Sequence, residues 1–141
     1  MAADGVPPAR GTVATARIGV ALAVASLLNH LAWLGWDRER VVEPDGSLSG
    51  PYEPWQVAGL VVCLGILAVL AGRLGLPKIG TIGVAGVMWL CWSIDAAMSD
   101  DSGLWVVGAV MLLPAALFGV GLVAFLAASG KIAGREVRSE E

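Results

Sequence analysis

The sequence predicts an all-α integral membrane protein, a bundle of four transmembrane helices built as two helical hairpins with both termini in the cytoplasm. Three observations support this fold class. Hydrophobic residues make up 57% of the 141 residues, charged residues make up only 15%, and the mean hydropathy is +0.76, which is unusual for a soluble domain. Four nearly uncharged runs are long enough to cross about 30 Å of hydrocarbon, which takes roughly 20 helical residues. Basic residues gather on one side of these runs.

The four runs predict helices because backbone polar groups in lipid must be hydrogen-bonded within their own segment. Strands of a membrane barrel would instead show about ten residues of alternating polarity. We expect one transmembrane domain at 17–130, flanked by cytoplasmic tails at 1–16 and 131–141. Its expected parts are helices at about 17–36, 55–73, 78–98 and 103–129, with an outer loop at 37–54.

The positive-inside rule predicts the orientation, because basic residues are retained on the cytoplasmic side. Arg38 and Arg40 lie on the side of the long polar loop, where acidic residues outnumber them. The other basic residues lie on the opposite side: Arg10, Arg17, Arg73, Lys78, Lys131, Arg135 and Arg138. We therefore expect a multi-pass protein of the plasma membrane with acidic outer loops.

The first helix follows a small-residue, proline-containing segment. A cleaved secretory signal is an alternative, with Arg17 as its basic region and Ala23-Val24-Ala25 as its cleavage site. That reading leaves only residues 18–22 as a hydrophobic region, so an uncleaved helix is favoured.

Tryptophans occur mainly near the outer helix ends, where their amphipathic rings prefer the headgroup level. Anchoring at the outer leaflet explains them, and a ring of aromatics around an outward-facing cavity is the alternative. The residues concerned are Trp33, Trp36, Trp55, Trp92 and Trp105, whereas Trp89 lies deeper.

The later helices carry proline and glycine signals. Pro54 suits the first position of the second helix, where its missing amide hydrogen costs nothing. Gly80, Gly83 and Gly86 are spaced three apart, which leaves one face of the third helix bare and suits close packing against another helix. Pro114 predicts a kink in the fourth helix.

A weak internal repeat relates the two hairpins. Leu31-Ala32-Trp33 and Leu90-Cys91-Trp92 each precede an acidic loop that leads through Ser-Gly to Trp55 or Trp105. True duplication about an axis along the membrane normal and chance matching in a biased composition both remain open.

Two segments carry a resemblance to a known group of proteins. They are GPYEPWQVAG at 50–59 and WSIDAAMSDDSGLWVVGA at 92–109. They resemble small four-helix membrane proteins of high-GC Gram-positive bacteria over helices two to four. The resemblance implies this topology and no particular activity.

Polar residues inside the membrane are costly and are therefore the first functional candidates. Counted at about 1.5 Å per residue, His30 and Asp95 lie at similar depths in the outer part of the bilayer. With Asn29 they form a candidate polar cluster, in which an imidazole beside a carboxylate could act as a pH-sensitive latch or a proton relay. The favoured interpretation is more ordinary: His30 shares local hydrogen bonds with Asn29, while Asp95 reaches the headgroups.

The sequence gives little support for a disulfide, a cofactor or metal site, a catalytic motif or nucleic-acid binding. Cys63 and Cys91 lie at similar depths, but no C-x-x-C motif is present and isolated apolar cysteines usually behave as small hydrophobes. No cofactor or metal is expected, because one histidine and two cysteines supply too few ligands for a bis-histidine haem or a structural zinc. Phosphate-loop, H-E-x-x-H and G-x-S-x-G motifs are missing. The scattered basic residues suit anionic lipid headgroups and do not indicate nucleic-acid binding.

Three functional interpretations follow. The favoured one is a non-enzymatic accessory or interaction subunit of the lipid bilayer, which associates with itself or with a larger membrane protein through its glycine-lined helix face and an outer recognition surface. We define that surface as Tyr52, Glu53, Trp55, Gln56, Asp100, Asp101 and Trp105. The alternatives are a small oligomeric transporter or channel lined by His30 and Asp95, and a membrane redox or lipid-modifying enzyme using Cys63, Cys91 or His30.

Overall fold

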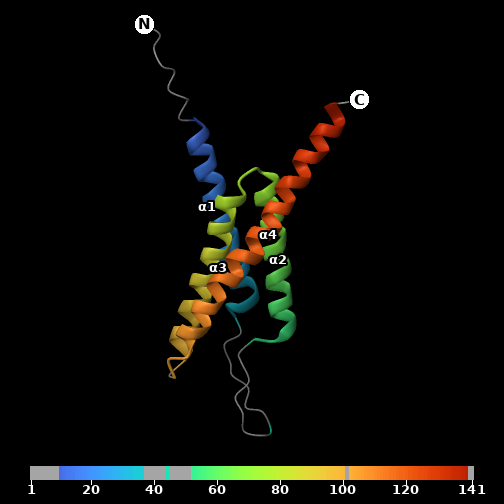
Figure 1. Cartoon of the computed structure of the whole chain (residues 1–141). Helices are drawn as coiled ribbons and strands as arrows, with labels where there is room; N and C mark the ends of the chain where they lie inside the picture. The colour runs from blue at the N-terminus through green and yellow to red at the C-terminus, as the bar shows by residue number, and fades with distance from the viewer. Residues whose placement is uncertain (1–9, 37–43, 45–51, 101, 140–141) are drawn as a thin grey trace.

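A computed structural model describes residues 10–36, 44, 52–100 and 102–139. Its helices are α1 (Arg10–Leu34), α2 (Pro54–Arg73), α3 (Pro77–Ser99) and α4 (Trp105–Ser139), shown in Figure 1. Each helix contains an apolar stretch long enough to cross a membrane. The protein is therefore an all-α, integral membrane four-helix bundle, as predicted, and the cytoplasmic location of the termini stays a prediction.

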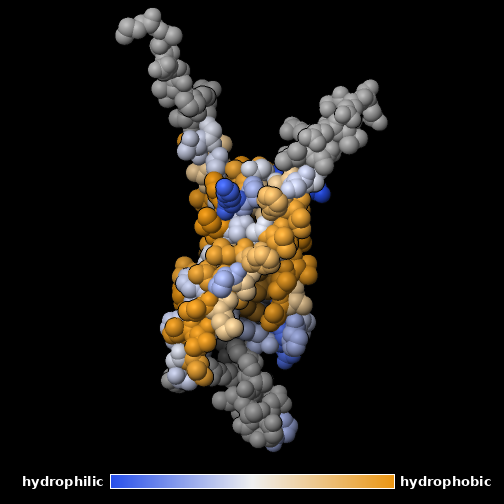
Figure 2. Space-filling view, viewed as in Figure 1, coloured by the Kyte–Doolittle hydropathy of each residue, from blue (hydrophilic) through white to orange (hydrophobic). Residues whose placement is uncertain are grey.

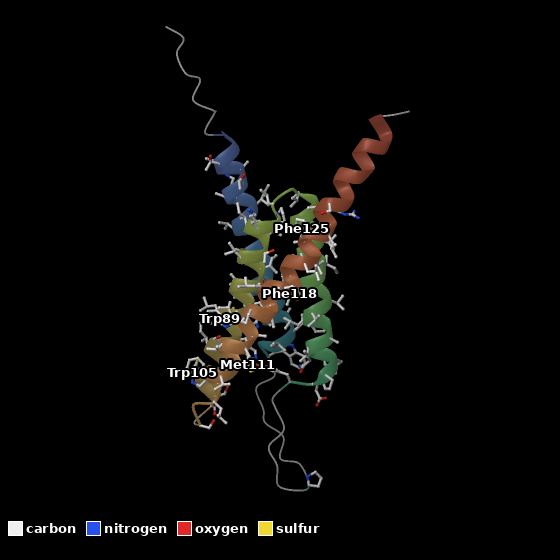
Figure 3. All side chains as sticks on the ribbon, viewed as in Figure 1. Trp89, Trp105, Met111, Phe118 and Phe125 are labelled. Carbon is white, nitrogen blue, oxygen red and sulfur yellow. The ribbon has the colours of Figure 1, made fainter. Side chains whose placement is uncertain are left out.

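The two ends of the bundle differ in what they carry. Helices α1 and α3 end, and helices α2 and α4 begin, at one end of the bundle, which we call the loop end (Figure 1). Helix α1 begins and helix α4 ends at the other, beside the short α2–α3 turn, and we call it the termini end. On the face shown in Figure 2, the surface between the two ends is mainly hydrophobic. Met111, Phe118 and Phe125 project from α4 (Figure 3), and all three are exposed, as expected for side chains that face lipid.

The helices are not packed as a symmetric square. Helix α4 lies diagonally across the bundle, over α3 near the loop end and over α2 near the termini end (Figure 1). Helix α1 packs against α2 and α3, and its described residues make no contact with α4. Helices α2 and α3 therefore form the centre of the bundle.

Small residues bring the helices close together at the termini end. A side chain at Gly72 of α2 would overlap the backbone carbonyl of Ala124 in α4, and one at Gly80 of α3 would overlap the side chain of Ala71. Ala68, Ala71 and Ala124 are completely buried beside these contacts. This is the usual means of helix association in lipid, where small residues allow backbones to approach.

In each hairpin, a tryptophan ring of one helix packs against a glycine of the other near the loop end. The ring of Trp33 in α1 lies where a side chain at Gly59 of α2 would begin. In the second hairpin, the ring of Trp92 in α3 occupies the same kind of space above Gly108 of α4. The two hairpins thus share a packing feature that involves residues matched, or nearly matched, in the internal repeat.

Proline and glycine set the helix boundaries around α2 and α3. Helix α2 begins at Pro54, as predicted, with Glu53 as its N-cap. Its C-terminus is closed by Gly75, whose φ of 77° is accessible to glycine at little cost. The N–H of Gly75 donates to the carbonyl of Gly72 and the N–H of Leu76 to that of Ala71, both at 3.0 Å, which is the Schellman arrangement.

Two helix ends differ from the predicted boundaries. Helix α1 begins at Arg10 and not near residue 17, and α4 continues to Ser139 and not to about residue 129. Parts of both expected tails are therefore helical. Propagation of an established helix requires little further ordering, so alanine-containing polar segments can extend it beyond the apolar run that was used to place its ends.

Candidate functional site

Helices α1 and α3 bring two ionisable side chains together near the loop end. The distance from Nε2 of His30 to Oδ2 of Asp95 is 2.8 Å. The His30 side chain is 2% exposed and that of Asp95 is 17% exposed, so the pair is largely shielded by protein. With a proton on Nε2, the imidazole donates to the carboxylate and joins the two helices.

The neighbouring polar side chains of α1 also bond to other helices. Nδ2 of Asn29 donates to the carbonyl of Leu60 in α2 at 3.2 Å. The hydroxyl of Ser26, one turn before His30, donates to the carbonyl of Val84 in α3 at 2.8 Å. The favoured expectation of a local hydrogen-bond network between Asn29 and His30, with Asp95 directed to the headgroups, is therefore wrong. Both α1 residues face neighbouring helices, so their partners lie across the bundle.

One nitrogen of the His30 ring has no hydrogen-bond partner among the described residues. It is Nδ1, which is buried. In the neutral ring with Nε2–H, Nδ1 is an acceptor, and in the imidazolium it becomes a donor. A buried polar atom without a partner typically costs about 1–3 kcal/mol. Gain of a proton at Nδ1 therefore replaces the need for a nearby hydrogen-bond donor with the need for an acceptor.

The cluster of Asn29, His30 and Asp95 lies close to the loop end of the bundle. His30 lies four residues before the end of α1, which corresponds to about 6 Å along a helix axis. The polar side chains that are buried in the described parts of the chain belong mainly to this half: Ser26, Asn29, His30, Gln56 and Ser93. Toward the termini end, the core consists of apolar side chains such as Leu22, Ala68, Ala71, Val120 and Ala124. The bundle is therefore polar inside at the loop end and apolar inside at the other.

Few other titratable groups surround the pair. Cys91 lies one turn before Asp95 on α3. Helix α2 has no ionisable side chain before Cys63 and Arg73, and the apolar span of α4 has none. Asp37, Arg38, Glu39 and Arg40 follow α1 and lie outside the described residues.

The predicted outer recognition surface is only partly exposed. Gln56 is completely buried, and its Oε1 accepts a hydrogen bond from the backbone N–H of Glu53 at 2.7 Å. Gln56 therefore closes the first turn of α2, and its assignment to a recognition surface is corrected. Glu53 and Trp55 are exposed, Tyr52 and Trp105 are half-buried, and Asp101 lies outside the described residues.

Asp100, another member of that surface, organises the start of α4. Its Oδ2 accepts a hydrogen bond from the backbone N–H of Trp105 at 2.8 Å, and its Oδ1 accepts one from the N–H of Ser102 at 2.8 Å. Carboxylates suit this position because the first amides of a helix lack partners within the helix. These contacts give Asp100 a structural role.

The glycines of α3 lie in two different environments. Gly80 packs against Ala71 of α2, and a side chain at Gly83 would meet the carbonyl of Gly19 in α1 at 3.4 Å. These two glycines serve contacts inside the bundle, so most of the predicted glycine face is not available to a partner. A side chain at Gly86 would meet no atom within 4 Å.

The two cysteines do not pair with each other in the described part of the chain. Cys63 and Cys91 are both free and half-buried, so no disulfide joins α2 to α3. No group of three or more His, Cys, Asp or Glu side chains lies together as a metal site within the described ranges.

Neither Ser26 nor Trp89 was predicted to donate a hydrogen bond to another helix, and both do. The Ser26 hydroxyl could have been found from its spacing, because Ser26 and His30 lie one turn apart and so share a helix face. Nε1 of Trp89 donates to the carbonyl of Ala109 in α4 at 2.7 Å. Its acceptor belongs to the backbone, and no residue type marks such an acceptor in the sequence.

No protein-family model, curated protein or solved structure matches the chain.

Proposed function

We propose that this membrane protein is a non-enzymatic, proton-responsive accessory subunit. In this proposal, protons from the loop-end side reach His30 and Asp95 and change the contact between α1 and α3. The altered packing of α1 against α3 then shifts the exposed residues at the loop end. A partner protein contacts these residues. The observation that carries the proposal is the 2.8 Å contact between His30 and Asp95 on separate helices, with Nδ1 left unpartnered among the described residues.

Histidine suits this role because its ring can gain a proton and a positive charge, which changes the hydrogen bonds that it makes. Protonation turns Nδ1 from an acceptor into a positively charged donor inside the bundle. The charged ring gains attraction to the carboxylate but acquires a buried N–H that needs a partner. Water entry or a rotation of α1 would supply that partner, and both would alter the α1–α3 interface.

A response from one side fits the distribution of polarity better than a transmembrane proton pathway does. Buried polar groups lie mainly near the loop end, whereas the core toward the termini end is apolar and closely packed. A proton-conducting route through one subunit would need polar groups or water along its whole length. The transporter interpretation is therefore less well supported than a sensor.

The orientation belongs to the same proposal. The positive-inside rule places the loop end outside the cell, so the pair would respond to external pH. The resemblance to small membrane proteins of high-GC Gram-positive bacteria supports a location in the plasma membrane.

The exposed tryptophans near the cluster provide a direct test. Trp36, two residues beyond the end of α1, lies 6.3 Å from Trp55 between ring centroids, and both side chains are exposed. Movement of α1 should therefore change their fluorescence. In liposomes, we expect the emission of the wild-type protein to show a transition as the pH on the loop-end side is lowered. His30→Gln and Asp95→Asn should abolish that transition.

Ser26→Ala is the matched control, because it removes a buried α1–α3 hydrogen bond that contains no titratable group. It should keep the transition, and Trp36→Phe should reduce its amplitude. A flat wild-type profile, or an unchanged transition in His30→Gln, would contradict the proposal. Proton flux through the wild-type protein that is lost in Asp95→Asn would support the transporter interpretation instead.

A further inference from the structure

A continuous apolar groove runs along α2 and α4. It consists of three adjoining cavities of about 750, 400 and 420 Å³. Val123 lines all three, and Gly65 is common to the second and third. Helices α2 and α4 diverge from their contact near the termini end toward the loop end (Figure 1). Ala85 and Met88 of α3 line the part between the diverging helices.

Among the described residues, the walls of this groove are hydrophobic except at one end. Arg73, the last residue of α2, lines both cavities nearer the termini end and is exposed. The groove therefore joins an apolar channel in the membrane-spanning part of the bundle to a guanidinium at the end of the span. A molecule that complements both features has a hydrocarbon chain and an anionic group.

The groove is long enough for one acyl chain. From Val61 to Arg73 is twelve residues of helix, or about 18 Å, which is close to the roughly 15 Å of hydrocarbon in one leaflet. Glycines on both walls keep it open, since a side chain at Gly65 or Gly119 would meet no atom within 4 Å. An acyl chain that lies along the groove would thus bring its headgroup to the level of Arg73.

We propose that the α2–α4 groove binds a phospholipid with an anionic headgroup, with one acyl chain along the groove and the phosphate at Arg73. Guanidinium groups bind phosphate through charge-assisted hydrogen bonds, and basic residues at membrane level attract anionic lipids. A second copy of the chain is less suitable. Around a two-fold axis along the membrane normal, it would place its own Arg73 at the same level and oppose two positive charges.

Native mass spectrometry of the detergent-purified protein tests this proposal. The probes are phosphatidylglycerol and phosphatidylcholine with identical acyl chains. We expect phosphatidylglycerol to be retained preferentially, and Arg73→Gln to reduce its binding about tenfold, which corresponds to one charge-assisted hydrogen bond. Lys78→Gln is the matched control, because it removes a positive charge near the same end from a residue that does not line these cavities.

Filling the groove tests the position of the acyl chain. Gly119→Phe on α4 and Gly65→Leu on α2 should each lower the binding of both lipids, with helix content unchanged by circular dichroism. Equal retention of the two lipids by the wild-type protein would overturn the proposal. So would equal losses in Lys78→Gln and Arg73→Gln, unaltered binding in both folded groove variants, or a dimer whose formation the groove variants block.

Discussion

Replacement of Gly72 by alanine tests whether α2 and α4 approach as closely as described. The added Cβ would overlap the carbonyl oxygen of Ala124 and lie 2.9 Å from the Cβ of Ala127. The obstructing oxygen belongs to the α4 backbone, so it cannot rotate away as a flexible side chain would. Overpacking of this kind costs about 1–3 kcal/mol, and we expect a value near the upper limit because the helices themselves must separate.

Gly65→Ala is the matched control on the same helix, because a Cβ at Gly65 would meet no atom within 4 Å. Both substitutions gain the helix propensity of alanine over glycine, about 1 kcal/mol, so the difference between the two variants isolates the steric cost. We expect Gly72→Ala to be less stable than Gly65→Ala by about 2–3 kcal/mol. Reversible unfolding in mixed micelles with increasing dodecyl sulfate, followed by circular dichroism, measures this difference. Equal stability of the two variants would refute the close approach.

Three further predictions concern individual contacts. A double-mutant cycle with His30→Phe and Asp95→Leu should give a coupling free energy of about 1–3 kcal/mol in the same unfolding assay, and additive effects would contradict a direct contact. Asp100→Ala should destabilise the protein by about 1 kcal/mol and increase amide hydrogen exchange in the first turn of α4, whereas Asp100→Asn, which keeps one acceptor oxygen, should retain part of the cap. Trp89→Phe should cost about 1 kcal/mol through loss of the hydrogen bond to Ala109, and an unchanged unfolding midpoint would show that this bond contributes nothing.

The features that were predicted correctly are those that short stretches of the sequence determine. Hydropathy located the four spans because lipid requires about 20 apolar residues for each helix. Pro54 marked the start of α2, since proline lacks the amide hydrogen that the first helical position does not use. The predicted bounds of the second and third helices left only a short connection between them, and Gly75 supplies the backbone conformation that closes it. These signals are local, so one sequence is sufficient to recognise them.

The orientation of each helix about its own axis was not predictable in the same way. In a soluble helix a polar face opposes an apolar one, but a helix in lipid can be apolar all round. Depth counting placed His30 and Asp95 at the same level but did not show that their side chains face each other. For the same reason, Gly80 and Gly83 were expected to face a partner and instead contact α2 and α1. The burial of Gln56 had a possible local signal, its spacing of three residues from Glu53, which resembles a capping box.

The placement of a tryptophan ring over a glycine in each hairpin has a consequence for biosynthesis. Since Trp33 and Gly59 both belong to the first hairpin, this unit can assemble its own internal contact before translation of the second hairpin is complete. The contact between Trp92 and Gly108 allows the second hairpin to assemble in the same way, without the first. Two polypeptides divided at the α2–α3 turn should therefore insert separately and recombine in the bilayer into the intact protein.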